Sequence, residues 1–295
     1  MMKILLLLLS ASLSLVSAVS NAQQSAGHED ATSFHFSYEL TAAYDDNIRR
    51  AKYDVDIRDD VLTGLALGVK SITHLSDATL LNLGLKFEAE QYDVFTELDN
   101  SKIEGSLAYV FSFSSSFSAS RYALKMKLGG IDSNSEMRTA NTASVGLDIN
   151  KWLTTTIHMT AGYTFKLQDA QSEVFDVEEN LLMINFDVDL TPRQLIYFTY
   201  HYIDGEIVSS ATPKLGFINA AQAIEPDDAF GGFSTNQFVY RIAAESNVFT
   251  LGYNAAISRS VSLDLSFRFV DSVATQDENI YYERQIIRAS LLGRF

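Results

Sequence analysis

Residues 280–295 read IYYERQIIRASLLGRF and decide how the rest of the sequence is interpreted. From Ile287 onward every second residue is apolar or small, and the positions between them are rich in arginine. Alternate side chains of a β-strand point to opposite faces. The pattern therefore predicts a strand with one apolar face, formed by Ile287, Ala289, Leu291, Gly293 and Phe295, and one charged face that carries Arg284, Arg288 and Arg294.

This ending, with an aromatic residue last and no polar tail after it, resembles the closing strand of bacterial outer-membrane β-barrels, a family that typically terminates in Phe. The resemblance implies that the apolar face meets lipid and that the arginine face points into an enclosed lumen. It also implies that the last strand pairs with the first, so that the sheet has no free edge.

Eleven further segments show the same alternation. The clearest is residues 81–90, where Leu81, Leu83, Leu85 and Phe87 alternate with polar residues. In residues 238–257 the apolar positions change parity near residues 245–247, which we interpret as a β-bulge. The expected strands are residues 34–44, 61–70, 81–90, 102–111, 121–128, 142–149, 156–166, 182–190, 196–202, 238–257, 261–269 and 280–295.

Short and long connections alternate along these segments. Outer-membrane barrels have short periplasmic turns and longer outer loops. We therefore predict an all-β fold: a closed, antiparallel, transmembrane up-and-down β-barrel of 12 strands, with short periplasmic turns and long outer loops. A soluble lipocalin-like barrel or β-sandwich is the alternative, but one face of each strand is too rich in charge, Gly, Ser and Thr to form a dry core.

The first residues predict export. Met1, Met2 and Lys3 precede an apolar run that is short for a membrane-spanning helix. Small residues follow, so we expect a signal peptide over residues 1–22, cleaved after Ala22 or, as the alternative, after Ala18. A short periplasmic lead over residues 23–32 and a single barrel domain over residues 33–295 complete the expected organisation. The expected location is the bacterial outer membrane.

Composition excludes several classes of protein. The chain has 37 Asp and Glu against 22 Lys and Arg, a net charge of −15, so it is a poor partner for nucleic acid. It has no Cys, which excludes disulfides and cysteine-bound metal. For an outer-membrane barrel the expected partners are membrane lipid, lipopolysaccharide and the barrel assembly machinery, together with a small solute or a polysaccharide.

The segment Ala42-Ala43-Tyr44-Asp45-Asp46-Asn47-Ile48 resembles the end of the first strand in a family of outer-membrane β-barrel porins often associated with exopolysaccharide export. The resemblance covers about the first 70 residues and implies a link to that process. The alternative is that these residues are simply the start of an acidic outer loop.

The polar faces of the strands predict the lining of the lumen. We expect a narrow channel for small hydrophilic or charged solutes, with a charged constriction that selects among them. The alternative is a lumen filled by cross-strand salt bridges, with Glu39 and Arg288 as one pair. The candidate lumen and constriction residues are Glu39, Lys86, Glu88, Glu90, Lys102, Glu104, Arg121, Lys125, Lys127, Lys166, His201, Arg268, Arg284 and Arg288.

The longest connection, residues 204–235, contains an apolar piece from Leu215 to Ile224. Apolar residues in an outer loop need cover, so we expect this connection to fold over the mouth or into it. A mobile surface hairpin is the alternative.

Nothing in the sequence indicates catalysis, a metal site or a cofactor. His201, with Asp204 beyond it, is the one histidine placed to act as a base, and no nucleophile motif accompanies it. Metal-ligand spacings and phosphate-binding glycine loops are absent. The alternative to a channel is a non-conducting barrel that acts as a partner or receptor in an envelope export system, and a hydrolase is a weaker third candidate.

Overall fold

The computed structural model describes residues 32–114, 116 and 119–295. The expected signal peptide and all of the expected lead except Thr32, which begins the first strand, lie outside these residues.

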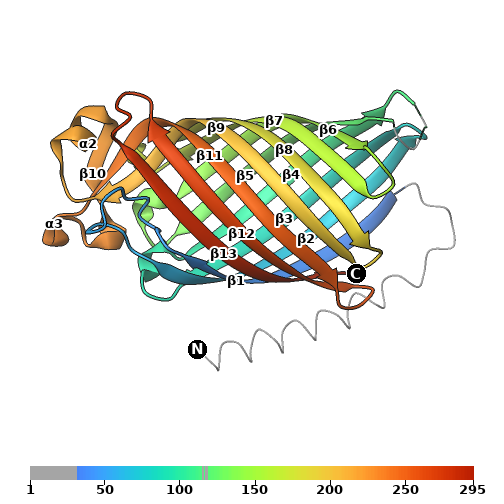
Figure 1. Cartoon of the computed structure of the whole chain (residues 1–295), viewed down its shortest axis with the longest axis horizontal. Coiled ribbons are helices and arrows are strands. Elements are labelled where there is room, and N and C mark those ends of the chain that lie inside the picture. The colour runs from blue at the N-terminus through green and yellow to red at the C-terminus, as the bar shows by residue number, and fades with distance from the viewer. Residues whose placement is uncertain (1–31, 115, 117–118) are drawn as a thin grey trace.

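Twelve strands form a closed antiparallel barrel in which each strand pairs with the next and the last pairs with the first (Figure 1). A thirteenth strand, β10 (Ala221–Pro226), lies in the long connection. The barrel strands are β1 (Thr32–Asp45), β2 (Asp60–Ser76), β3 (Thr79–Tyr92), β4 (Asn100–Ser112), β5 (Arg121–Ser133), β6 (Ala140–Trp152), β7 (Ile157–Ala170), β8 (Val177–Thr191), β9 (Gln194–Ala211), β11 (Phe238–Ala256), β12 (Val261–Ala274) and β13 (Tyr281–Arg294). The predicted fold class is confirmed.

The seam between β1 and β13 closes as residues 280–295 predict. The register runs from Ser37 opposite Arg294 to Asp45 opposite Ile286. At its end the backbones of Phe36 and Phe295 exchange two hydrogen bonds of 3.2 and 3.0 Å, and the Phe295 ring stacks on Tyr38 at 5.7 Å between centroids. Closure leaves every barrel strand with two neighbours, so no barrel strand presents a free edge.

The apolar faces of the strands point away from the barrel. Leu85 on β3 and Leu128 on β5 keep 51% and 54% of their surface exposed, although a water-soluble protein would bury such side chains. The polar faces point inward. This arrangement excludes the sandwich and the soluble barrel, because in those folds the apolar faces would meet in a common core.

The two ends of the barrel differ. The short helices α2 (Leu215–Ala220) and α3 (Gly232–Thr235) gather with β10 at one end, which we call the loop end (Figure 1). The C-terminus lies at the opposite end, the turn end. No helix in the described part of the chain is long and apolar enough to span a membrane.

The barrel strands are 13 to 19 residues long, and all but β11 and β13 are longer than predicted. About 9 to 11 residues suffice for a tilted strand to cross the hydrocarbon layer, so the barrel projects beyond it. The extra length shortens some loops: residues 93–99 connect β3 to β4 at the loop end, while residues 113–120 connect β4 to β5 at the turn end. The predicted contrast in connection length is therefore weaker than expected.

The predicted bulge near residues 245–247 is wrong. β11 is one continuous strand that pairs with β9 and with β12 in a single register. The apolar residues Tyr240, Ile242 and Val248 share the inward face with Thr250 and Asn254. The apolar positions therefore change parity because the apolar face of β11 is outward in one half of the strand and inward in the other, while the backbone stays regular.

Candidate functional site

Every predicted lumen residue occupies an inward-facing position of its strand, as the cross-strand registers show. Lys86 stands opposite Glu104, Glu88 opposite Lys102, and Lys166 opposite Glu179. Arg121 lies at the turn end of β5, opposite Ser112 and Asn150, and is exposed there. The remaining candidates are Glu39, Glu90, Lys125, Lys127, His201, Arg268, Arg284 and Arg288.

A ladder of alternating charges crosses β3, β4 and β5. Lys86 pairs with Glu88, and Lys102 lies 3.8 Å from Glu88 and 3.3 Å from Glu104. Lys127 completes the ladder at 2.9 Å from Glu104. Each carboxylate thus serves two ammonium groups, so three lysines share two glutamates and the ladder keeps a net positive charge.

Further ion pairs lie on the same side of the barrel. Lys125 pairs with Asp148, which is buried, and Lys166 lies 2.9 Å from Glu179. Part of the lumen therefore contains the cross-strand salt bridges of the alternative interpretation.

The wall formed by β12 and β13 is different, because Arg268 and Arg288 belong to no ion pair in the described residues. They are neighbours on the inward face, since Arg288 stands opposite Ser266 and Arg268 opposite Ile286. The predicted pair between Glu39 and Arg288 is not formed. Register explains this: Glu39 stands opposite Leu292, and its carboxylate accepts a 3.1 Å hydrogen bond from Thr41 instead.

Asp204, the carboxylate that follows His201 in the sequence, does not lie on the same face as His201. His201 stands between Val248 and Met183 on the inward face. Asp204 is three residues further along the strand and therefore points outward, so the carboxylate cannot orient the imidazole.

The Tyr44–Ile48 segment holds the seam together at the loop end. The buried carboxylate of Asp45 accepts hydrogen bonds from Nε of Arg284, 2.9 Å from each oxygen, and from its Nη2. Asp46 accepts a 2.7 Å bond from the backbone N–H of Gln285. The amide of Asn47 donates to the carbonyl oxygens of Ala51 and Glu283, at 2.8 and 2.9 Å. These residues therefore join β1 to β13.

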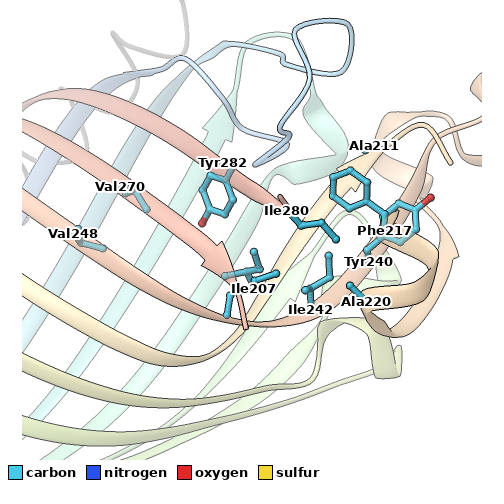
Figure 2. Packing of buried hydrophobic residues seen from close by; sticks show 12 residues of the cluster. Ile207, Ala211, Phe217, Ala220, Tyr240, Ile242, Val248, Val270, Ile280 and Tyr282 are labelled. Carbon is cyan, nitrogen blue, oxygen red and sulfur yellow. The ribbon is translucent and has the colours of Figure 1, made fainter. Parts of the chain in front are cut away.

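An apolar cluster covers the inward face of β9, β11, β12 and β13 near the loop end. Figure 2 shows it extending from Val248 and Val270 on the barrel wall to Phe217 of α2. We call it the inner cluster. Its buried members are Ile207, Ala211, Phe217, Ala220, Tyr240, Ile242, Ala244, Val248, Val270, Ala274, Ile280 and Tyr282.

The inner cluster supports a cap over the loop end. β9 and β11 continue beyond Gly205 and Ala243, and β10 pairs with β11 to make a three-stranded extension. Residues 206–211 of β9 extend past the last pairing with β8, and this part of β9 binds the loop between β1 and β2. The Ser210 N–H donates to the Arg49 carbonyl, and the Ser209 hydroxyl donates to the Arg50 carbonyl, both at 2.8 Å. We define the cap as residues 206–243 together with the Arg49–Arg50 loop.

Asp227 fastens the cap to a neighbouring loop. Its carboxylate is fully buried and accepts bonds from Arg138 at 2.7 Å, from the Ala229 N–H at 3.2 Å and from the Ser210 hydroxyl. Arg138 also reaches Asp228 at 2.8 Å. The long connection therefore packs over the mouth, as one of the two interpretations of its sequence predicts.

Aromatic contacts complete the cap. The Phe230 ring meets Phe95 edge-on at 4.9 Å, and the Arg49 guanidinium lies 4.4 Å from the centre of the Phe230 ring. Burial lowers the pKa of Arg49, and the charge of Arg58 lowers it further. No pattern in the sequence pointed to Arg49, Arg138 or Asp227, because their partners lie up to about 190 residues away along the chain.

Two cavities lie at the ends of the lumen. The loop-end cavity, of about 470 Å³, lies between the cap and the barrel wall, with Arg49 and Phe230 on one side and Glu88, Lys102 and Lys166 on the other. The turn-end cavity, of about 510 Å³, is lined by Glu39, Lys86 and Arg294 among others. Charged side chains therefore surround the space at both ends.

No family model matches this sequence, and no curated protein matches it. Solved structures do resemble the fold. An outer membrane channel from Pseudomonas putida F1 superposes with a TM-score of 0.56 and 8% identity, over 92% of this chain and 98% of that chain. This likeness shows that the chain has the fold of an outer-membrane β-barrel.

Two other solved structures show a weaker similarity to this chain. The KdgM porin has a TM-score of 0.45 and 10% identity, over 87% of this chain and 99% of that chain. The CymD monoaromatic hydrocarbon channel has a TM-score of 0.47 and 8% identity, over 89% and 88%.

Proposed function

We propose that this protein is an outer-membrane channel for small hydrophilic solutes, with a preference for anions. The observation that carries the proposal is a closed barrel with an apolar exterior and a charged lumen, in which Arg268 and Arg288 have no carboxylate partner in the described residues. Outer-membrane barrels have their longer loops outside the cell, so we place the loop end outside and both termini in the periplasm. Export would use the signal peptide of residues 1–22.

The arginine pair on β12 and β13 supports the preference for anions. The extra lysine of the ladder is offset by Glu90, an inward carboxylate on β3 that has no ion pair within the described residues, so the local excess of positive charge lies at Arg268 and Arg288. Charged rings in a narrow pore select ions of the opposite sign because the wall has a low dielectric constant and focuses the field. The net negative charge of the whole chain does not oppose this, since selectivity depends on the charges that line the path.

The proposal does not extend to exopolysaccharide export. The residues that resemble that porin family, from Tyr44 to Ile48, already have a structural role at the seam.

Planar-bilayer recording of the purified protein tests the channel. We expect discrete openings with a reversal potential that favours chloride over potassium in a salt gradient. Replacing both unpaired arginines, as R268Q/R288Q, should reduce the chloride preference. R193Q, in the turn between β8 and β9, is the matched control. Cation-selective openings in the unmodified protein would contradict the anion preference.

The cap favours one second candidate, a barrel that conducts no solute and serves as a partner in an envelope machine. Replacing residues 212–237 with Asn-Gly would join Ala211 to Phe238, which already pair, through a two-residue hairpin. If only this variant conducts, the unmodified protein is a channel closed by its cap. If both are silent, the partner interpretation is supported and the channel is rejected.

A further inference from the structure

The loop-end cavity has the properties of a ligand site. Its volume of about 470 Å³ lies within the usual range for small-molecule pockets, roughly 300–1,000 Å³. It combines charged side chains from the barrel wall with others from the cap. Residues of both signs line the same space, so their pairing decides what the cavity could bind.

Most of the charged groups there already have partners. Lys102, Lys166, Arg138 and Arg284 each form an ion pair. Four lining residues form none within the part of the chain that the structure describes: Arg49 and Arg50 from the cap, Glu90 on β3 and Glu206 on β9. Glu206 accepts a 2.7 Å hydrogen bond from the Glu178 N–H. The cavity thus keeps two guanidinium groups and two carboxylates without a charged partner.

Both arginines have an energetically unfavourable environment, Arg49 through burial and Arg50 through its backbone conformation. Arg49 is 6% exposed; its Nη1 donates to Gln237 Oε1 at 3.2 Å and to the Asp56 carbonyl at 3.4 Å, while its Nε has no hydrogen-bond partner. Arg50 has a φ of +53°, a left-handed conformation that Gly or Asn adopts with less strain. The Ser209 hydroxyl fixes the Arg50 carbonyl in place. Strain of this kind is common where a side chain has a role in binding.

Aromatic and apolar groups complete the lining. Tyr92 lies near the charges of Glu90, Arg284 and Arg50, and Phe175, Phe230 and Val208 face the same space. A ligand that fits this set has one anionic group, one cationic group and an apolar or aromatic body.

We propose that the loop-end cavity binds a small amphoteric solute, an amino acid or a dipeptide, whose carboxylate meets Arg49 and Arg50 and whose ammonium meets Glu90 and Glu206. Guanidinium groups bind carboxylates through paired, charge-assisted hydrogen bonds. The inference rests on the proposed channel function, because a solute reaches this cavity through the lumen or past the cap.

Calorimetric titration of the detergent-solubilised protein tests the site with three probes. Glycyl-L-phenylalanine carries both charges, its N-acetyl derivative lacks the ammonium, and its amide lacks the carboxylate. We expect the dipeptide to bind at least about tenfold more tightly than either derivative, since each charged hydrogen bond contributes about that factor.

Two variants assign the charges. R50N introduces asparagine, which tolerates the left-handed backbone. It should weaken binding of the dipeptide and of the N-acetyl derivative about tenfold and leave binding of the amide unchanged. E90Q should weaken binding of the dipeptide and of the amide, and it should leave binding of the N-acetyl derivative unchanged. R193Q and D77N, in turns at the opposite end, are the matched controls and should bind all three as the unmodified protein does.

Equal affinity for the dipeptide and its N-acetyl derivative would overturn the proposal, as would an E90Q variant that binds all three probes normally. Bilayer recording separates this inference from the channel function. A conducting protein that binds none of the probes rejects the site and leaves the channel. A silent protein with the expected binding pattern rejects the channel and leaves the site.

Discussion

The two halves of β11 show opposite patterns within one regular strand. In residues 249–256, Phe249 and Leu251 point outward and are 40% and 56% exposed, while Thr250 points inward. In residues 238–248 the outward positions include Glu245 and Asn247, and the inward face is apolar except for Ser246. The backbone register does not change between them. The difference shows that the surroundings of the strand change along its length.

The neighbouring strands change polarity near the same place. On the loop-end side of this change, the outward positions carry the acidic residues Asp204, Asp271 and Glu283. The inward positions there carry Ile207, Val270 and Tyr282, which belong to the inner cluster. A strand that leaves the hydrocarbon layer no longer needs an apolar outer face. Its inner face then packs against the loops that cover the mouth. The change in parity therefore marks the edge of the lipid-facing belt on this wall.

The largest expected effect concerns the fastening of the cap, which exists only at the loop end. D227A removes the buried acceptor of three hydrogen bonds, from Arg138, the Ser210 hydroxyl and the Ala229 N–H, and leaves Arg138 only its pair with the more exposed Asp228. Loss of a buried charged group with several partners costs about 4 kcal/mol. We expect the free energy of cap opening, measured by native-state hydrogen exchange at residues 227–237, to fall by that amount. E173A, which breaks the more exposed pair with Arg241, is the control and should cost under about 1 kcal/mol.

The second effect compares apolar residues on the two halves of β11. I242A should lower the free energy of unfolding by about 3 kcal/mol, because Ile242 is fully buried in the inner cluster and its loss leaves a cavity. L251A, on the outward face, should cost less, since lipid chains fill the space. Unfolding in denaturant from lipid vesicles measures both. Equal losses would mean that the two halves share one environment.

The smallest effect compares two outward positions six residues apart. L251R places a cation among lipid chains and should destabilise the barrel by about 2 kcal/mol. E245R on the same face should change stability by less than about 0.5 kcal/mol if residue 245 is already in water. The same vesicle titration measures both variants. A similar penalty at both positions would move the edge of the apolar belt outward and remove our explanation of the parity change.

Several features followed from the sequence directly. In residues 81–90 the same face of the strand is apolar along its whole length. Both the strand and its inward glutamates were therefore predicted correctly. The seam followed from residues 280–295. The bulge in β11 was predicted wrongly because periodicity reports only which face is apolar, and the apolar face can turn toward lipid or toward a packed loop.

The partners of the charged residues did not follow from the sequence. Glu39 and Arg288 both lie on the lumen side, as expected, yet the register places them too far apart to pair. The contacts that fasten the cap did not follow from the sequence either, since Arg49, Arg138 and Asp227 belong to three separate connections.

The sequence by itself determined that the strands have two faces and which face is polar, because both depend on alternation between near neighbours in the chain. Closure of the sheet was implied by the resemblance of the last strand to the closing strands of outer-membrane barrels. Only the tertiary structure decided which charges neutralise one another, which arginines stay unpaired and how the mouth is covered. Those outcomes depend on strand register and on contacts between distant loops, and local sequence periodicity contains no information about either.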